Sequence, residues 1–101
     1  ELGERMMART RYAMTRLGEL PGVRIPFAGS HHVHEFVVDY TGTGRTVAEV
    51  HRALLERGIL AGTDLSADFP ALGQSALVAV TEVRTQADID RLVEGVGEAT
   101  R

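Results

Sequence analysis

The stretch 1–20 has the hydrophobic spacing of an amphipathic helix. Its apolar residues share one side of that helix: Leu2, Met6, Met7, Ala13, Met14, Leu17 and Leu20. Basic residues occupy the other side: Arg5, Arg9, Arg11 and Arg16. Pro21 cannot continue the backbone hydrogen-bond ladder, so together with Gly22 it ends the helix. We expect the apolar side to pack into the core, and the arginines to face solvent or a further domain.

Two strands are predicted next. Val23, Ile25 and Phe27 alternate with polar or proline positions, which indicates a short strand. Pro26 has no N–H to donate, so this strand is expected at a sheet edge. After a turn at 28–30, the stretch 34–40 alternates again and predicts a second strand. One face of that strand carries Phe36, Val38 and Tyr40, and the other carries Glu35, Val37 and Asp39.

A second helix is predicted from Thr46 to about Arg57. Thr46 and Glu49 have the spacing of a capping box, and Gly58 stands where helices favour a left-handed residue. The expected buried stripe of this helix is Val47, Val50, Leu54 and Leu55. The preceding stretch 41–46 is rich in glycine and lies between a strand and a helix, as phosphate-binding loops do. It lacks the lysine and the third glycine of those motifs, so we interpret it as a connection that ends in a helix cap.

The stretch 58–85 contains the predicted core strand. Ile59 and Leu60 begin a new extended piece, and a long loop follows over 62–75. Leu65 and the pair Phe69-Pro70 are interpreted as anchors that hold this loop on the core. The continuous apolar run at 76–80 predicts a strand that is central in its sheet or covered on both faces.

The last helix is predicted to begin after Thr85, with Asp88 completing a second capping box. Its apolar residues have the i, i+3, i+4, i+7 spacing of one helical face: Ile89, Leu92, Val93 and Val96. The glycine-containing tail 95–101 is expected to fray. The order helix, strand, strand, helix, short strand, strand, helix describes a single α+β domain over 1–101. We expect a small, largely antiparallel sheet with helices mainly on one face.

Composition excludes several classes of function. The chain of 101 residues has a formal net charge of −3, so it has no basic footprint for nucleic acid. No apolar run approaches the roughly 20 residues of a membrane helix, and we expect no membrane-spanning segment. There is no cysteine and no secretory leader pattern, so a cytoplasmic protein is expected. All eleven basic residues are arginine, and the sequence begins at Glu1 inside a helical pattern, which suggests a piece of a longer protein.

Three histidines precede the second strand: His31, His32 and His34. His32 and His34 would share a strand face, and such a pair can bind zinc. A zinc site needs further ligands, however, and His51 is predicted on a helix away from them. We therefore predict no metal site and interpret the cluster as part of a surface or a domain interface, with His34 and Glu35 bordering a pocket.

Several stretches together resemble one known family. They are LPGV at 20–23, EFVV at 35–38, LLERGILAG at 54–62, Asp64-Leu65, FPAL at 69–72, LVAVTE at 77–82 and TQADIDRLV at 85–93. The sequences and the order of these stretches resemble the C-terminal segment of the glycine cleavage system P-protein, subunit 1. The resemblance covers essentially the whole chain. At position 34 this chain has histidine where that family has asparagine.

The resemblance implies a role in a pyridoxal-phosphate enzyme of the aspartate-aminotransferase fold. In this family the segment is a small domain that packs on the large domain of the same subunit and helps to close the active site. The reaction decarboxylates glycine and passes the aminomethyl group to the lipoyl arm of H-protein. The cofactor is held by a lysine that in two-subunit forms belongs to subunit 2, and the subunits pair into a heterotetramer. A chain without lysine cannot hold the cofactor as a Schiff base.

No catalytic, cofactor-binding or metal-ligating residue of the family transfers onto this chain. His34 and Glu35 are our candidates for residues near the active site or the subunit interface. Two other interpretations stay open. The chain could be the small domain of another pyridoxal-phosphate enzyme of the same fold, or a free-standing α+β module that regulates or binds proteins.

Overall fold

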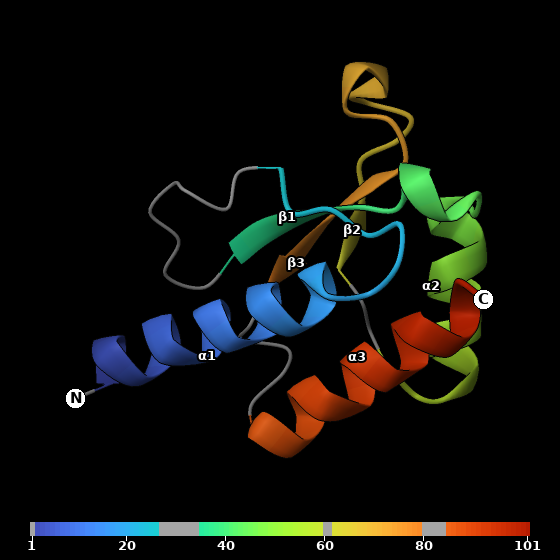
Figure 1. Ribbon diagram of the computed structural model, residues 1–101. Helices are drawn as coiled ribbons and strands as arrows, with labels where there is room; N and C mark the ends of the chain where they lie inside the picture. Colours follow the sequence, from blue (N-terminus) through green and yellow to red (C-terminus); the bar gives the residue numbers. More distant parts are fainter. Residues whose placement is uncertain (1, 27–34, 60–61, 80–84) are drawn as a thin grey trace.

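The computed structural model describes the backbone of residues 2–26, 35–59, 62–79 and 85–101, and side chains from residue 8 onward within these ranges. The helices and strands in this part of the chain are, in order, α1 (Leu2–Gly18), β1 (Glu35–Asp39), α2 (Val47–Glu56), β2 (Thr63–Asp64), β3 (Ser75–Ala79) and α3 (Gln86–Ala99) (Figure 1). Two short 3₁₀-helices, η1 (Thr41–Thr43) and η2 (Pro70–Leu72), lie in the connections. The predicted α+β class is confirmed.

The described strands form one antiparallel sheet in the order β1-β3-β2. β3 lies at its centre, with Val37 of β1 and Thr63 of β2 both opposite Leu77. The prediction that the apolar run at 76–80 is the central strand is therefore confirmed, with the strand ending at Ala79 in the described part. A central strand has neighbours on both sides, which suits a continuous apolar sequence better than a polar one.

The short strand predicted over 23–27 is wrong where the structure describes it. Only Arg24 pairs, through a bridge to Asp39 in which both N–H···O distances are below 3 Å, at 2.9 and 2.8 Å. The N–H of Val23 donates to the carbonyl of Leu20 at 3.1 Å, so it is used by the turn. The next hydrogen-bonding position toward the C-terminus is Pro26, which has no N–H and cannot extend the ladder. Phe27 lies outside the described residues.

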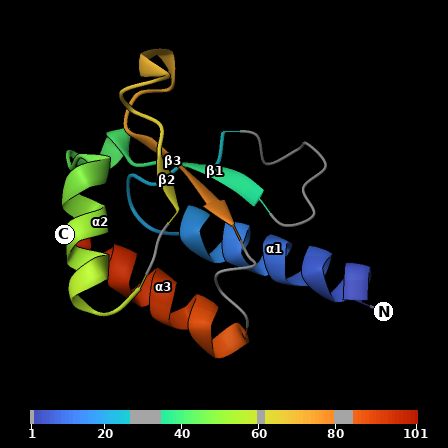
Figure 2. The same ribbon diagram turned by 180° about the vertical axis from the view of Figure 1, so that it is seen from behind.

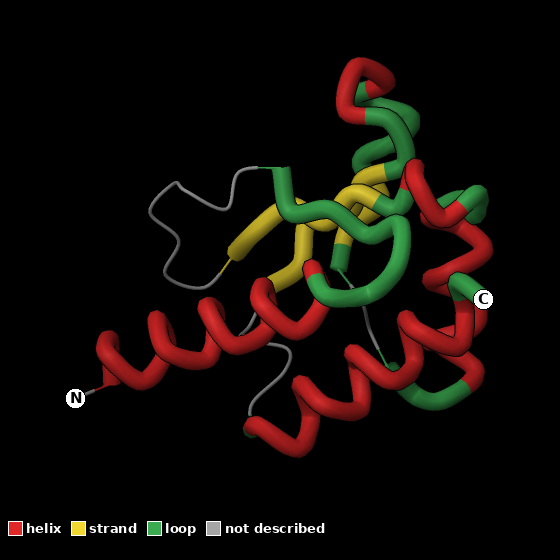
Figure 3. Tube along the Cα trace, in the orientation of Figure 1, coloured by secondary structure: helices red, strands yellow, loops and turns green. Residues whose placement is uncertain are grey.

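The helices lie mainly on one side of the sheet, as predicted. Figure 1 and the reverse view in Figure 2 both show α1 and α3 side by side beneath the strands, with α2 beside them (Figure 3). A polar contact joins α1 to α3: the Tyr12 hydroxyl donates to Asp90 Oδ1 at 2.5 Å, and Arg16 Nη1 donates to the same oxygen at 2.9 Å. Arg16 therefore does not only face solvent. Arg57, at the end of α2, forms an ion pair with Glu98 of α3.

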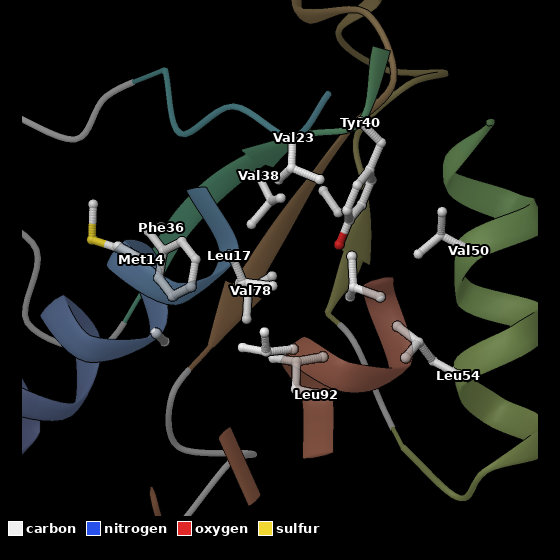
Figure 4. Packing of buried hydrophobic residues seen from close by; sticks show 14 of the residues in the cluster. Met14, Leu17, Val23, Phe36, Val38, Tyr40, Val50, Leu54, Val78 and Leu92 are labelled. Atoms are coloured by element: carbon white, nitrogen blue, oxygen red, sulfur yellow. The ribbon is translucent and has the colours of Figure 1, made fainter. Parts of the chain in front are cut away.

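The core fills the space between the sheet and the helices (Figure 4). Phe36, Val38 and Tyr40 all point into it and are at most 1% exposed, as the alternation of β1 predicted. The expected apolar residues of α3 are also buried: Ile89, Leu92, Val93 and Val96. In α1 the described members of the apolar side, Ala13, Met14 and Leu17, are buried; Leu20 follows the end of α1 at Gly18 and is half-buried.

Both predicted capping boxes are present. The Thr46 hydroxyl accepts from the Glu49 N–H, and Thr85 does the same for Asp88, while each carboxylate accepts from the N–H of its cap residue. Gly58 has φ +76°, the left-handed value predicted for the end of α2. Each box satisfies two amide groups that a helix start leaves without intrahelical partners.

Two sequence expectations, the burial of Leu55 and the fraying of the tail, are wrong. Leu55 is 62% exposed, because the core contacts of α2 come from Val47, Val50 and Leu54 instead. The tail does not fray at 95, since α3 continues to Ala99 and Gly95 is buried against Leu54. The short strand predicted to start near Ile59 and Leu60 is present as β2, at Thr63–Asp64; Leu60 itself lies outside the described residues.

The connection 65–74 is also held differently than expected. Phe69 is 54% exposed and does not anchor the loop on the core. Leu65 and Leu72 are half-buried and likewise lie outside the core cluster. Backbone hydrogen bonds shape the loop instead, from Leu65 N to Ser75 O and from Phe69 N to Leu65 O, both at 2.9 Å. The loop is thus organised locally, and its aromatic ring stays at the surface.

Candidate functional site

One face of the sheet is turned away from α1 and α3, and we call it the outer sheet face. It consists of Glu35, Val37, Thr63, Leu77 and Ala79, which alternate with the buried residues of the same strands. Val37 and Leu77 lie opposite each other near its centre and are both half-buried. Glu35 and Thr63 are exposed. This face combines a small apolar centre with a polar edge, as a docking surface does.

Glu35 is the described member of the predicted site pair. It is the first residue of β1, is exposed, and lies opposite Ala79 of β3. His34, together with His31 and His32, lies outside the described residues. The structure thus places Glu35 at the border of the outer sheet face, and its role near an active site or interface stays a prediction.

The described residues bring no metal-ligand group together. Within them no three histidine, aspartate or glutamate side chains converge on one point. His51 lies on α2 and approaches Asp64 of β2, which gives two such side chains rather than a site. Among the described helices none has the length and apolar character needed to cross a lipid bilayer.

The glycine-containing stretch 41–46 forms a structural connection between β1 and α2. It holds η1, and the left-handed Gly44 donates to the Thr41 carbonyl. Two of the amides that begin α2 have partners within the protein: Glu49 N donates to Thr46 Oγ1, and Val47 N donates to Gln74 Oε1 at 2.9 Å. The predicted helix cap at the end of this connection is therefore confirmed.

Gln74 has a structural role that no sequence pattern indicates. Its side chain caps α2 from a distant part of the chain, and its backbone N–H donates to Thr41 Oγ1 at 2.9 Å. It therefore joins the end of the 65–74 connection to η1 and α2 at once. Only tertiary structure creates these contacts, since Gln74 is distant in sequence from both partners.

His51 is the one polar group whose buried atom has no partner within the described chain. Its ring is half-buried, and Nε2 has neither solvent contact nor a hydrogen bond there. Burial lowers the pKa of His51 below 6.5, because the charged ring loses water, and the Asp64 carboxylate opposes this only in part. Hydrogen bonds from Ser66 N and Oγ lower the pKa of Asp64, so that carboxylate stays ionised at neutral pH.

This arrangement predicts a loss of stability on mild acidification. The unfolded chain protonates His51 at a higher pH than the folded chain does, so it binds more protons as pH falls through about 6.5. The free energy of unfolding should therefore decrease as pH drops below that value. His51→Gln should lose less stability than the unmodified chain between pH values of about 7 and 5. Urea unfolding followed by circular dichroism measures this, with Arg52→Gln, an exposed neighbour on α2, as control. Equal acid losses in the His51 and Arg52 variants would contradict it.

A groove runs along α1 next to residues 23–26. It has a volume of about 690 Å³, an apolar floor that includes Met14 and Val23, and two exposed arginines at its rim, Arg11 and Arg24. The arginine-bearing side of α1 therefore borders a surface that is partly apolar and partly basic. Of the arginines expected to face solvent or a further domain, Arg9 and Arg11 are exposed, whereas Arg16 contacts Asp90; contact with a further domain stays a prediction.

The chain is similar over almost its whole length to proteins of one name. Probable glycine dehydrogenase (decarboxylating) subunit 1 of Geobacillus kaustophilus (strain HTA426) is 43% identical over 98 residues, which are 97% of this chain and 21% of that protein. The protein of the same name from Desulfitobacterium hafniense (strain DSM 10664 / DCB-2) is 39% identical over the same shares. The chain thus spans about one fifth of these relatives. No protein-family model matches it.

A solved structure has the same fold. The crystal structure of glycine decarboxylase (P-protein) of the glycine cleavage system, in inhibitor-bound form, matches with a TM-score of 0.77 and 26% identity. The match covers 96% of this chain and 21% of the solved one. The sequence comparison and the fold comparison therefore both match this chain to about one fifth of a longer relative.

Proposed function

We propose that this chain, a homologue of one segment of glycine dehydrogenase (decarboxylating) subunit 1, acts as a non-catalytic small domain of that enzyme. One observation carries the proposal: the similarity runs across 97% of the chain at 43% identity. A solved glycine decarboxylase that shares the fold over 96% of the chain supports it independently. The parent enzyme would decarboxylate glycine and pass the aminomethyl group to the lipoyl arm of H-protein.

The residues of this chain do not fit a covalent pyridoxal-phosphate site. A Schiff base with the cofactor needs a side-chain amine, and all eleven basic residues here are arginine, whose guanidinium stays protonated. The cofactor of the parent enzyme is therefore assigned to a lysine elsewhere, on a large domain, and in two-subunit forms on subunit 2. The contribution of this chain is structural: it packs against that domain and helps to exclude water from the active site.

The outer sheet face is the surface that we assign to the large domain of the same subunit. Its apolar centre, Val37 and Leu77, is only half-buried, and covering it would remove further apolar surface from water. Glu35 lies at its edge, beside the position that precedes β1. The remaining partners of the proposal are subunit 2 in a heterotetramer, lipoylated H-protein and the substrate glycine. We assign the assembly to the cytoplasm.

A comparison of the chain with its parent protein tests the proposal. The isolated chain, with its α-amino group acetylated, should give no borohydride-reducible absorption band with pyridoxal phosphate, because no side-chain amine is present. The full-length subunit that contains this segment, mixed with subunit 2 and H-protein, should exchange the carboxyl carbon of glycine with bicarbonate. A reducible band on the acetylated chain, or a full-length pair without exchange, would contradict the proposal.

A further inference from the structure

His51 lies in the middle of α2, beside the edge of the sheet that β2 forms. The ring approaches Asp64 of β2, and Figures 1 and 2 both show β2 on the side of the sheet nearest α2. The ring as a whole is half-buried, and its Nε2 has neither solvent contact nor a hydrogen bond within the described chain. Buried polar atoms normally have a partner, so an exception of this kind calls for a physical explanation.

Protonation changes what this nitrogen requires from its surroundings. In a neutral imidazole one nitrogen carries no proton, so Nε2 can occupy a place that offers no acceptor. In the charged ring both nitrogens carry a proton, and Nε2 becomes a buried, charged donor with no acceptor in the described chain. The charged form is therefore unfavourable in this position, and burial lowers the pKa of His51.

An acceptor for the charged ring is present at the surface. Asp64 is exposed, and it accepts hydrogen bonds from Ser66 N at 2.8 Å and from Ser66 Oγ at 2.6 Å. Those bonds lower the pKa of Asp64, so the carboxylate stays ionised when the pH falls through the range in which histidine titrates. Its charge favours the protonated form of His51.

The other charged residues of the surrounding elements are used elsewhere or face solvent. β3 carries no charged residue, and Arg52, the neighbour of His51 on α2, is exposed. Several charged residues of α2 and α3 have other contacts: Glu49 and Asp88 in the helix caps, Asp90 with α1, and Arg91 and Glu98 with Arg57. Asp64 is therefore the charged group of the described chain to which a protonated His51 turns.

The two elements beside His51 are not held equally firmly. α2 is fixed at both ends, since Val47 N donates to Gln74 Oε1 at its start and Arg57 forms an ion pair with Glu98 at its end. β2 consists of two exposed residues at the edge of the sheet. Short edge elements with few buried contacts open at a lower free energy than the core does. A change at His51 therefore affects β2 more than α2.

We propose that His51 is a proton-dependent switch between two arrangements of this sheet edge. The neutral ring lies buried beside β2. When Nε2 takes up a proton from solvent, the ring turns to the surface and pairs with Asp64, and β2 loosens while the helices and the β1–β3 pair stay folded. The pKa of His51 is lowered below 6.5 in the closed arrangement, so that arrangement is stable above about this pH and is lost as the pH falls. The inference does not depend on the proposed function.

Hydrogen–deuterium exchange measured by mass spectrometry tests the switch in the full-length protein that contains this segment. Rates at pH values of about 7.5 and 5.5 are compared after correction for intrinsic exchange. Protection of the amides of 62–66, among them the Leu65 N–H that donates to Ser75 O, should fall about threefold or more at the lower pH. Protection of α3 should not fall. His51→Gln should remove this pH dependence, and Arg52→Gln, the matched control on α2, should keep it.

Asp64→Asn tests the second half of the switch. It removes the acceptor of the charged ring, so the loss of protection at 62–66 should move to lower pH. Asp64 is exposed, and this variant keeps the test decisive if His51→Gln does not fold. Three results would overturn the inference: an unchanged pH response in either variant, protection that rises on acidification, or an equal loss of protection throughout the domain. The last result would mean that protonation unfolds the whole domain instead of its edge.

Discussion

Replacing Gly62 with alanine should destabilise the chain by at least about 3 kcal/mol, as the sum of backbone strain and overpacking. Gly62 has φ +97°, a conformation that residues with a Cβ rarely adopt. A Cβ built on Gly62 would lie 1.9 Å from the Leu77 carbonyl oxygen and 2.8 Å from its carbon. Those atoms belong to the backbone of β3, the central strand, so they cannot move aside as a flexible side chain would.

Gly58→Ala is the matched control for this prediction. Gly58 also has a positive φ, +76°, but no atom lies within 4 Å of the position that a Cβ would take there. Only the conformational cost remains, about 1–2 kcal/mol. Urea unfolding of the two variants compares them directly, and equal losses of unfolding free energy would show that the close approach to Leu77 does not matter.

The parts of the fold that the sequence predicted are those that local chemistry determines. The side chains of Thr46 and Glu49 reach each other across one helical turn, so their spacing alone predicts the cap. The burial of Phe36, Val38 and Tyr40 follows from the two-residue repeat of a strand. The central place of β3 follows from an apolar run that suits neighbours on both sides.

The errors concern residues whose environment is set by distant parts of the chain. Leu55 and Leu54 are neighbours in an apolar stripe, and only the position of α3 decides that Leu54 is buried against Gly95 and Leu55 is not. The sequence likewise shows Phe69-Pro70 as an apolar pair in a long loop, which resembles an anchor. In the structure the connection 65–74 is shaped by backbone hydrogen bonds and the ring of Phe69 is 54% exposed, which the apolar pair alone does not indicate.

The candidate site could be predicted only in part. The position of Glu35 at the start of a strand is predictable from the alternation that follows it, and Glu35 lies at the edge of the outer sheet face. The roles of Gln74 and of His51 Nε2 are not predictable, because neither the cap that Gln74 gives to α2 nor the burial of His51 leaves a local pattern. The absence of lysine, in contrast, is a property of composition, and it supports the non-catalytic role proposed for the chain before any fold is known.

Replacing Phe36 with alanine should cost about 3–5 kcal/mol of unfolding free energy. Phe36 is 1% exposed and lies between the sheet and the helices, so its removal leaves a cavity as well as lost transfer energy (Figure 4). A domain of this size has a total stability of about 5–15 kcal/mol, and the variant would retain only a part of it. Thermal and urea unfolding of the chain measure the loss.

Phe69→Ala is the control that separates burial from residue type. It removes the same side chain at a position that is 54% exposed, and it should change stability by no more than about 0.5 kcal/mol. A loss at Phe69 as large as that at Phe36 would contradict this, because it would mean that the exposed ring stabilises the domain as much as a buried one. The expected contrast instead shows that the effect of removing a phenylalanine depends on its burial. Phe36 stabilises the core, whereas Phe69 contributes little to the stability of the domain.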